Sequence, residues 1–131
     1  MTKRPLVLIA EDDAGVRMTL EFVLSDEGFD VLAAEDGEQA LTLALDRSPD
    51  AILLDQMMPK MNGKEVLSAL RASEATSDIP VFVLSGMDPS MAGGGGAEVE
   101  WPSAHFVGKP FDPETLIEGI RRALDPPAIT P

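Results

Sequence analysis

The stretch that decides the fold is AILLDQMMPKMNG, residues 51–63. It begins with uninterrupted apolar side chains, a pattern typical of a strand buried on both faces of a parallel sheet. An acidic residue, Asp55, ends the run, and the turn formers Pro59 and Gly63 follow closely. Aspartate is itself a common turn residue, so the meaning of Asp55 depends on whether other strands also end in polar side chains.

Further short apolar runs precede and follow this segment. They are PLVLIA (5–10), DVLAA (30–34), VFVLS (81–85) and AHFVG (104–108). The segments between and after them place apolar side chains at helical spacing, at residues 14–28, 36–48, 63–73 and 112–124. Alternating helices and uniformly apolar strands predict an α/β protein with a flavodoxin-like, doubly wound, five-stranded parallel sheet of order 2-1-3-4-5.

Each predicted helix has an apolar stripe that we expect to face the sheet. These stripes are Val16, Leu20, Val23 and Leu24 in the first helix, Ala40, Leu41, Ala44 and Leu45 in the second, and Val66, Leu67 and Leu70 in the third. In the last helix Asp112 is a candidate N-cap and Pro113 occupies the first helical position.

The segment between the fourth and fifth strands departs from this pattern. A helix is expected there, but the chain has the four successive glycines Gly93 to Gly96. Each glycine costs a helix about 1 kcal/mol relative to alanine. We therefore expect this helix to be short, disrupted or mobile. A glycine-rich phosphate cradle is the alternative, but the Lys-Ser or Lys-Thr of such loops does not follow.

Composition excludes several classes of function. The formal net charge is -13, from 23 acidic and 10 basic residues, so bare nucleic acid is not an expected partner. The chain has no cysteine, which excludes disulfides and thiolate chemistry. Apolar runs are far shorter than the roughly 18 residues that a membrane helix needs, so we expect no membrane insertion and a cytoplasmic protein.

The length of 131 residues suits one domain. We expect this domain to span residues 1–125 and a Pro-rich tail to span 126–131. The expected domain leaves no room for a separate output module, so the chain should act through protein partners.

Polar side chains follow several of the predicted strands. They are Glu11, Asp12 and Asp13 after the first, Asp55 after the third, Ser85 at the end of the fourth and Lys109 after the fifth. The carboxyl ends of parallel strands share one edge of a sheet, where ligands bind. Converging carboxylates repel one another unless a cation lies among them, and Mg²⁺ is the natural ion. Lysine and serine suit a phosphoryl group, so the set indicates phosphoryl transfer with Asp55 as covalent acceptor.

These residues, in this order, resemble the receiver domain of bacterial two-component response regulators. The resemblance rests on Asp12-Asp13, on Asp55 in LLDQMMPKMNG, on Ser85, and on Lys109 in FVGKPF. It covers residues 5–125. It implies that Asp55 accepts the phosphoryl group, assisted by Ser85 and Lys109.

The resemblance also implies a metal site and a switch. Mg²⁺ would be held by Asp12, Asp13, Asp55 and the backbone carbonyl of Met57. Ser85 and Phe106 would form the conformational switch, Phe106 taking the place of the switch aromatic.

The resulting hypothesis is a stand-alone response regulator, a signalling phosphoacceptor that catalyses only its own phosphorylation and dephosphorylation. The implied partners are a sensor histidine kinase or histidine phosphotransfer protein and a downstream protein target, with a phosphorylation-dependent dimer as a further alternative. A non-phosphorylated pseudo-receiver scaffold is the main competing hypothesis. An aspartate-nucleophile phosphatase would need an acid where Met57 stands. A flavin binder would need a phosphate loop where Glu11, Asp12 and Asp13 stand.

Overall fold

The computed structural model describes residues 4–56, 60–85, 105–108 and 112–124. In chain order its elements are β1 (Leu6–Ala10), α1 (Ala14–Asp26), β2 (Asp30–Ala34), α2 (Gly37–Arg47), β3 (Ala51–Asp55), α3 (Gly63–Ala72), β4 (Val81–Ser85), β5 (His105–Gly108) and α5 (Pro113–Leu124). The predicted glycine-rich segment, Lys109, Met57 and the tail lie outside the described residues. Among the described helices, none combines the length and apolar character needed to cross a membrane.

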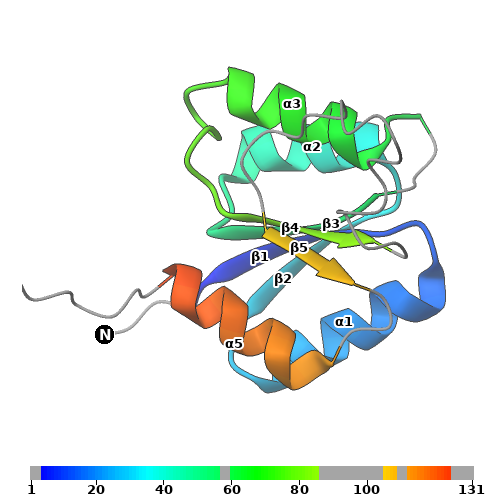
Figure 1. Ribbon diagram of the computed structural model, residues 1–131, viewed down its shortest axis with the longest axis vertical. Helices are drawn as coiled ribbons and strands as arrows, with labels where there is room; N and C mark the ends of the chain where they lie inside the picture. The colour runs from blue at the N-terminus through cyan, green and yellow to red at the C-terminus, as the bar shows by residue number, and fades with distance from the viewer. Residues whose placement is uncertain (1–3, 57–59, 86–104, 109–111, 125–131) are drawn as a thin grey trace, which may run out of the picture.

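The strands form one sheet of order β2-β1-β3-β4-β5, and every neighbouring pair is parallel. This confirms the predicted sheet and strand order. Helices α2 and α3 cover one face of the sheet, and α1 and α5 cover the other (Figure 1). The central strand β3 is buried along its whole length, as its apolar run predicts.

Alternate side chains of β1, β3 and β4 enter two separate cores. Leu53 and Val7 pack with α1 and α5, whereas Ile52 and Leu8 pack with α2 and α3. This alternation follows from the two-residue period of a strand. Because both faces are covered, nearly every position of β1 and β3 must be apolar.

Most of the predicted helix stripes lie against the sheet. The buried members are Leu20, Leu24, Ala40, Ala44, Val66, Leu67 and Leu70. One member was predicted wrongly, because the side chain of Leu45 is 45% exposed. Helix α2 meets the sheet through the small side chains of Ala40 and Ala44, and Leu45 lies about 100° further around the helix than Ala44. Its side chain therefore lies on the flank of the helix.

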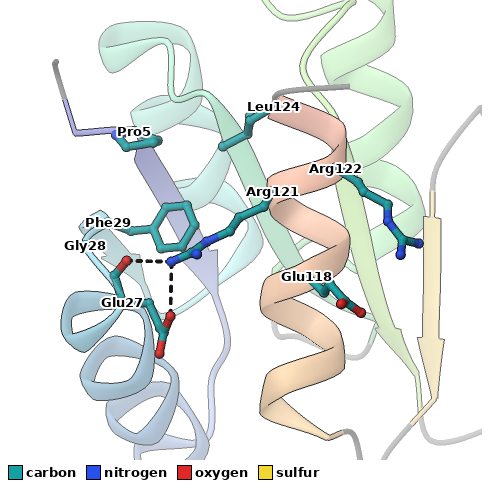
Figure 2. Close-up of a pocket in the computed structure, with 8 residues that line it drawn as sticks. All are labelled: Pro5, Glu27, Gly28, Phe29, Glu118, Arg121, Arg122 and Leu124. Atoms are coloured by element: carbon teal, nitrogen blue, oxygen red, sulfur yellow. Dashed lines mark hydrogen bonds and ion pairs between the residues drawn. The ribbon is translucent and has the colours of Figure 1, made fainter. Parts of the chain in front are cut away.

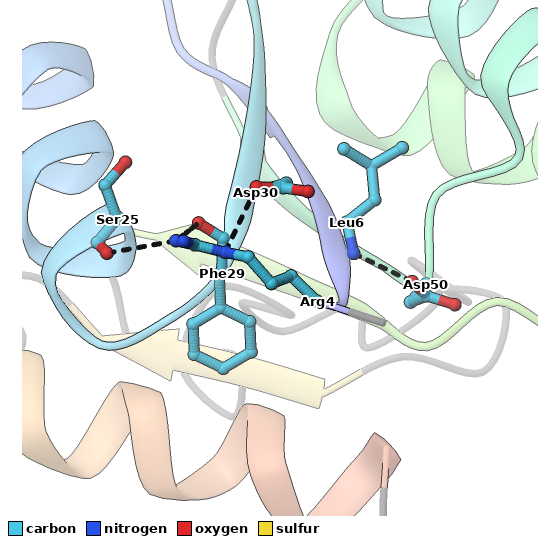
Figure 3. A network of polar contacts seen from close by, with 6 residues as sticks. All are labelled: Arg4, Leu6, Ser25, Phe29, Asp30 and Asp50. Atoms are coloured by element: carbon cyan, nitrogen blue, oxygen red, sulfur yellow. Dashed lines mark hydrogen bonds and ion pairs between the residues drawn. The ribbon is translucent and has the colours of Figure 1, made fainter. Parts of the chain in front are cut away.

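Two networks hold the turns at the amino-terminal edge of the sheet. Arg4 donates to the carbonyls of Phe29, at 3.1 Å, and Ser25, at 3.4 Å, and forms an ion pair with Asp30 (Figure 3). Asp50 accepts a hydrogen bond from the backbone of Leu6 at 2.7 Å. These contacts fasten the starts of β1 and β2 to the neighbouring turns.

A second arginine shapes the connection from α3 to β4. Arg71 donates to the carbonyls of Ser77 and Ile79 at 3.0 and 2.8 Å. Burial lowers the pKa of the Arg71 guanidinium and the nearby Asp78 carboxylate opposes this shift. The buried hydroxyl of Thr76 donates to the carbonyl of Leu70 at 2.6 Å. This carbonyl, near the end of α3, also accepts from the amide of Ser73 at 3.3 Å.

Candidate functional site

The strand register brings the predicted site residues to one edge of the sheet. Ala10 of β1 pairs with Leu54 of β3, so the next residues, Glu11 and Asp55, lie side by side at the carboxyl ends of these strands. Asp55 in turn pairs with Leu84 of β4. The parallel sheet thus positions the central acidic side chains directly, as strand topology predicts.

Three carboxylates meet at this edge. Ligand oxygens of Glu11, Asp12 and Asp55 all lie within 4.8 Å of one another. Glu11 and Asp55 are buried, with 1% and 5% of their surfaces exposed, whereas Asp12 is exposed. We call these three residues the acidic cluster. The acidic cluster therefore combines two buried carboxylates with one that is exposed to solvent.

Backbone contacts fix Glu11 within the cluster. Its amide donates to the carbonyl of Ala34 on β2 at 3.1 Å, and its own carbonyl accepts from Arg17 of α1 at 2.9 Å. Its carboxylate accepts a hydrogen bond from the amide of Asp13 at 3.2 Å. Glu11 therefore prolongs the line of β1 and turns its side chain into the edge of the sheet.

Asp13 occupies a different position from Glu11 and Asp12. It is the N-cap of α1, and its carboxylate accepts a hydrogen bond from the amide of Val16 at 3.0 Å. Sequence reasoning chose Asp12 and Asp13 as the acidic pair, whereas the structure groups Glu11 with Asp12 and Asp55. The preference for aspartate immediately before a helix is the signal that places Asp13 at the cap. The metal-binding roles of Asp12 and Asp13 stay predictions.

The other predicted site residues are only partly described. Ser85 ends β4 and its backbone pairs with Gly108 of β5, while Phe106 pairs with Val83. These pairings set Ser85 at the same edge of the sheet as the acidic cluster. The side-chain roles of Ser85 and Phe106 stay predictions. Met57 and Lys109 lie outside the described residues.

The start of α3 lies close to the end of β3. The amide of Gly63 donates back to the carbonyl of Gln56 at 2.9 Å. A Cβ atom at Gly63 would come within 2.8 Å of the carbonyl oxygen of Asp55, closer than real Cβ atoms approach. Asn62 and Glu65 form a reciprocal capping box that starts α3 at this point. Glycine is therefore required where the chain folds back over Asp55.

The acidic cluster has the chemistry of a site for a hard divalent cation. Its donors are all carboxylate oxygens, which Mg²⁺ prefers, and their number suits an ion that keeps waters and a phosphate oxygen among its ligands. Carboxylate groups this close repel one another when charged, and a bound cation relieves that repulsion. The residues present therefore fit the magnesium ion that the sequence predicts.

A pocket lies at the opposite edge of the sheet, and none of the predicted site residues lines it. Its volume is about 430 Å³, and it lies between the end of α5 and the start of β2 (Figure 2). Arg121 crosses it, donating to the carbonyl and carboxylate of Glu27 at 2.8 and 3.0 Å and lying 5.6 Å from the centre of the Phe29 ring. These contacts tie α5 to the turn after α1.

The fold and the acidic cluster together define a class: a doubly wound α/β domain whose central strand ends in a buried aspartate that lies among further carboxylates. The family model for the response regulator receiver domain matches residues 7–121. The chain belongs to this family. The match confirms the resemblance drawn from the sequence.

Known relatives agree with this assignment. The chain is 37% identical over 123 residues to the DNA-binding response regulator MtrA of Mycobacterium tuberculosis, covering 94% of this chain and 52% of MtrA. It therefore spans about half the length of this curated relative.

Solved structures match over nearly their whole length. The receiver domain of Francisella response regulator 1452 has a TM-score of 0.81 and 30% identity, over 92% of this chain and 97% of that one. The chemotaxis response regulator CheY4 of Vibrio cholerae has a TM-score of 0.80 and 31% identity, over 93% of this chain and 100% of that one.

Proposed function

We propose that the protein accepts a phosphoryl group on Asp55 from a phosphohistidine donor in a Mg²⁺-dependent reaction, and that its phosphorylated state is recognised by protein partners. The observation that carries this proposal is the position of Asp55. It is 5% exposed, ends the central strand, and lies within 4.8 Å of two further carboxylates. An aspartate that served only as a turn residue would not need two further carboxylates beside it.

The chemistry follows from the acceptor carboxylate. A carboxylate oxygen of Asp55 would attack the phosphorus atom, forming an O–P bond as the P–N bond to the donor imidazole breaks. The electron pair of that bond stays with the imidazole nitrogen, which then takes up a proton. The result is an acyl phosphate on Asp55. The enzyme-like contribution of the chain is to position the acceptor and to stabilise charge.

Glu11, Asp12 and Asp55 would hold Mg²⁺, which neutralises charge between the acceptor and the incoming phosphoryl group when bound. This proposal puts Glu11 in the place first predicted for Asp13. The family resemblance further implies that the backbone carbonyl of Met57 would complete the metal site. Ser85 and Lys109 would bind the phosphoryl oxygens, and Ser85 and Phe106 would transmit the change to partners.

An exposed apolar strip on α1 supports a protein partner. The side chains of Met18 and Phe22 are 63% and 73% exposed and lie one helical turn apart. They belong to the helix that Asp13 caps, directly after the acidic cluster. A donor protein that reaches Asp55 would be expected to cover this strip, and we place that encounter in the cytoplasm.

The test is phosphorylation by a small-molecule phosphoryl donor, followed by intact mass measurement with Mg²⁺ and with the metal chelated. The proposal expects one added phosphoryl group that depends on the metal. A protein that binds Mg²⁺ but gains no phosphoryl group from small-molecule and phosphohistidine donors alike would be a scaffold rather than an acceptor.

A further inference from the structure

The corner between β2 and α2, residues 36 and 37, makes a close contact with the loop that follows Asp55. Asp36 caps α2, and its carboxylate accepts a hydrogen bond from the amide of Gln39 at 2.8 Å. Gly37 is the first residue of the helix and is buried. Neither residue belongs to the acidic cluster, and the proposed function gives them no role.

Gly37 packs against the backbone of Met61. A Cβ atom on Gly37 would come within 2.1 Å of the carbonyl oxygen of Met61 and 2.6 Å of its Cβ atom. Real Cβ atoms essentially never approach closer than 3.0 Å, and the obstructing oxygen belongs to the backbone. The loop can therefore lie where it does only because residue 37 has no side chain.

An ion pair makes a second connection between the same two segments. The ammonium group of Lys60 lies 3.6 Å from the second carboxylate oxygen of Asp36. Lys60 has a φ angle of +73°, a left-handed conformation that non-glycine residues seldom adopt. Such a conformation persists when surrounding contacts determine the path of the chain. The contacts of Asp36 and Gly37 therefore help to hold Lys60 and Met61 in this conformation.

The far end of the 60–63 segment is held beside the acceptor. The amide of Gly63 donates to the carbonyl of Gln56, the residue directly after Asp55, at 2.9 Å. A shift of Met61 would therefore be passed to the backbone that carries the acceptor. We propose that Asp36 and Gly37 form a latch that sets the position of the loop after Asp55, and that Gly37 is a positioning residue for phosphoryl transfer. This inference rests on the proposed function.

The central experiment replaces Gly37 with alanine. Relieving the contact requires Met61 to move by about 1 Å, and a misplacement of about 1 Å can cost roughly 100-fold in rate. We expect Gly37→Ala to lower the phosphorylation rate at saturating donor and Mg²⁺ by at least about tenfold, because orientation acts on the bound state. The rate is measured by intact mass against time.

Gly119→Ala is the matched control. It is the same substitution in a helix, but its Cβ atom would meet Phe82 at 3.5 Å, an ordinary contact. This control should react within about twofold of the wild type. Circular dichroism and urea unfolding verify that both variants are folded. A Gly37→Ala variant that is folded and reacts as fast as Gly119→Ala would overturn the proposal.

Asp36→Asn tests the ion pair and decides the question if Gly37→Ala fails to fold. Asparagine keeps the helix cap but removes the charge that holds Lys60. Because the pair is partly exposed, we expect a rate decrease of only about two- to fivefold, with shifted amide resonances in residues 60–63. An unchanged rate together with unchanged resonances would overturn the latch.

The same amide resonances separate the two proposals. If the wild type is never phosphorylated, the proposed function fails, but shifted loop resonances in Gly37→Ala beyond those of Gly119→Ala would still establish the latch. If the wild type is phosphorylated and neither latch variant changes the rate or the resonances, only the latch fails.

Discussion

Two single substitutions, each of a carboxylate by an amide, test whether Glu11 or Asp13 is a ligand of Mg²⁺. Glu11→Gln and Asp13→Asn remove the same charge and nearly preserve side-chain size. The amide oxygen introduced by Glu11→Gln can still accept the hydrogen bond from the backbone of Asp13, and asparagine is as good a helix cap as aspartate. Both variants should therefore fold, and any difference in Mg²⁺ affinity reports the position of the lost charge.

The expected magnitudes follow from the acidic cluster. Two unit charges 4 Å apart attract by about 1 kcal/mol in water, so a doubly charged ion beside one carboxylate gains about 2 kcal/mol. Loss of the Glu11 charge should then raise the Kd for Mg²⁺ by about 30-fold. Asp13 caps α1 outside the cluster, so its screened attraction to Mg²⁺ should be only a few tenths of a kcal/mol. Asp13→Asn should therefore change the Kd for Mg²⁺ by less than about twofold.

Isothermal titration calorimetry with Mg²⁺ measures both constants at fixed ionic strength. The reasoning predicts a large loss of affinity in Glu11→Gln and near wild-type affinity in Asp13→Asn. The opposite order would refute the assignment and restore Asp13 to the metal site.

Two further predictions concern stability and partner docking. Thr76→Val removes a buried hydroxyl that donates to the carbonyl of Leu70 and leaves that carbonyl only the 3.3 Å hydrogen bond from Ser73, so it should cost about 1 kcal/mol in urea unfolding. Thr115→Val, at an exposed hydroxyl, should cost less than about 0.5 kcal/mol. Equal losses would contradict the role of burial. Phe22→Ala should change the free energy of unfolding by less than about 0.5 kcal/mol, because its side chain is 73% exposed. It should nevertheless reduce the rate of phosphoryl transfer from a phosphohistidine protein and leave the rate of transfer from a small-molecule donor unchanged. Equal transfer rates from the protein donor would show that the strip on α1 is not used.

The arrangement of the sheet was predictable because its strands are short, apolar runs separated by helical patterns. This alternation and the handedness of crossovers leave few topologies, and the order β2-β1-β3-β4-β5 is the one among them that the sequence favours. Leu45 was predicted wrongly because periodicity gives the direction of a stripe but not its width. The width depends on how closely a helix approaches the sheet, and Ala40 and Ala44 leave α2 a narrow contact.

The acidic cluster was predictable in outline from three acids after β1 and one after β3. The sequence alone did not decide which members of Glu11-Asp12-Asp13 face Asp55, because that depends on where β1 ends and α1 begins. The contact between Gly37 and Met61 left no trace in the local pattern. It joins two segments that are far apart in sequence, and only packing brings them together.

The most direct test of the central claim is where the phosphoryl group is attached. The wild-type protein and Asp55→Asn are incubated with Mg²⁺ and a small-molecule phosphoryl donor, and their intact masses are compared. Asparagine nearly preserves the size of the side chain but removes the nucleophilic carboxylate. The account predicts one added phosphoryl group in the wild type and none in Asp55→Asn. Equal phosphorylation of both proteins would contradict it and move the acceptor to another residue.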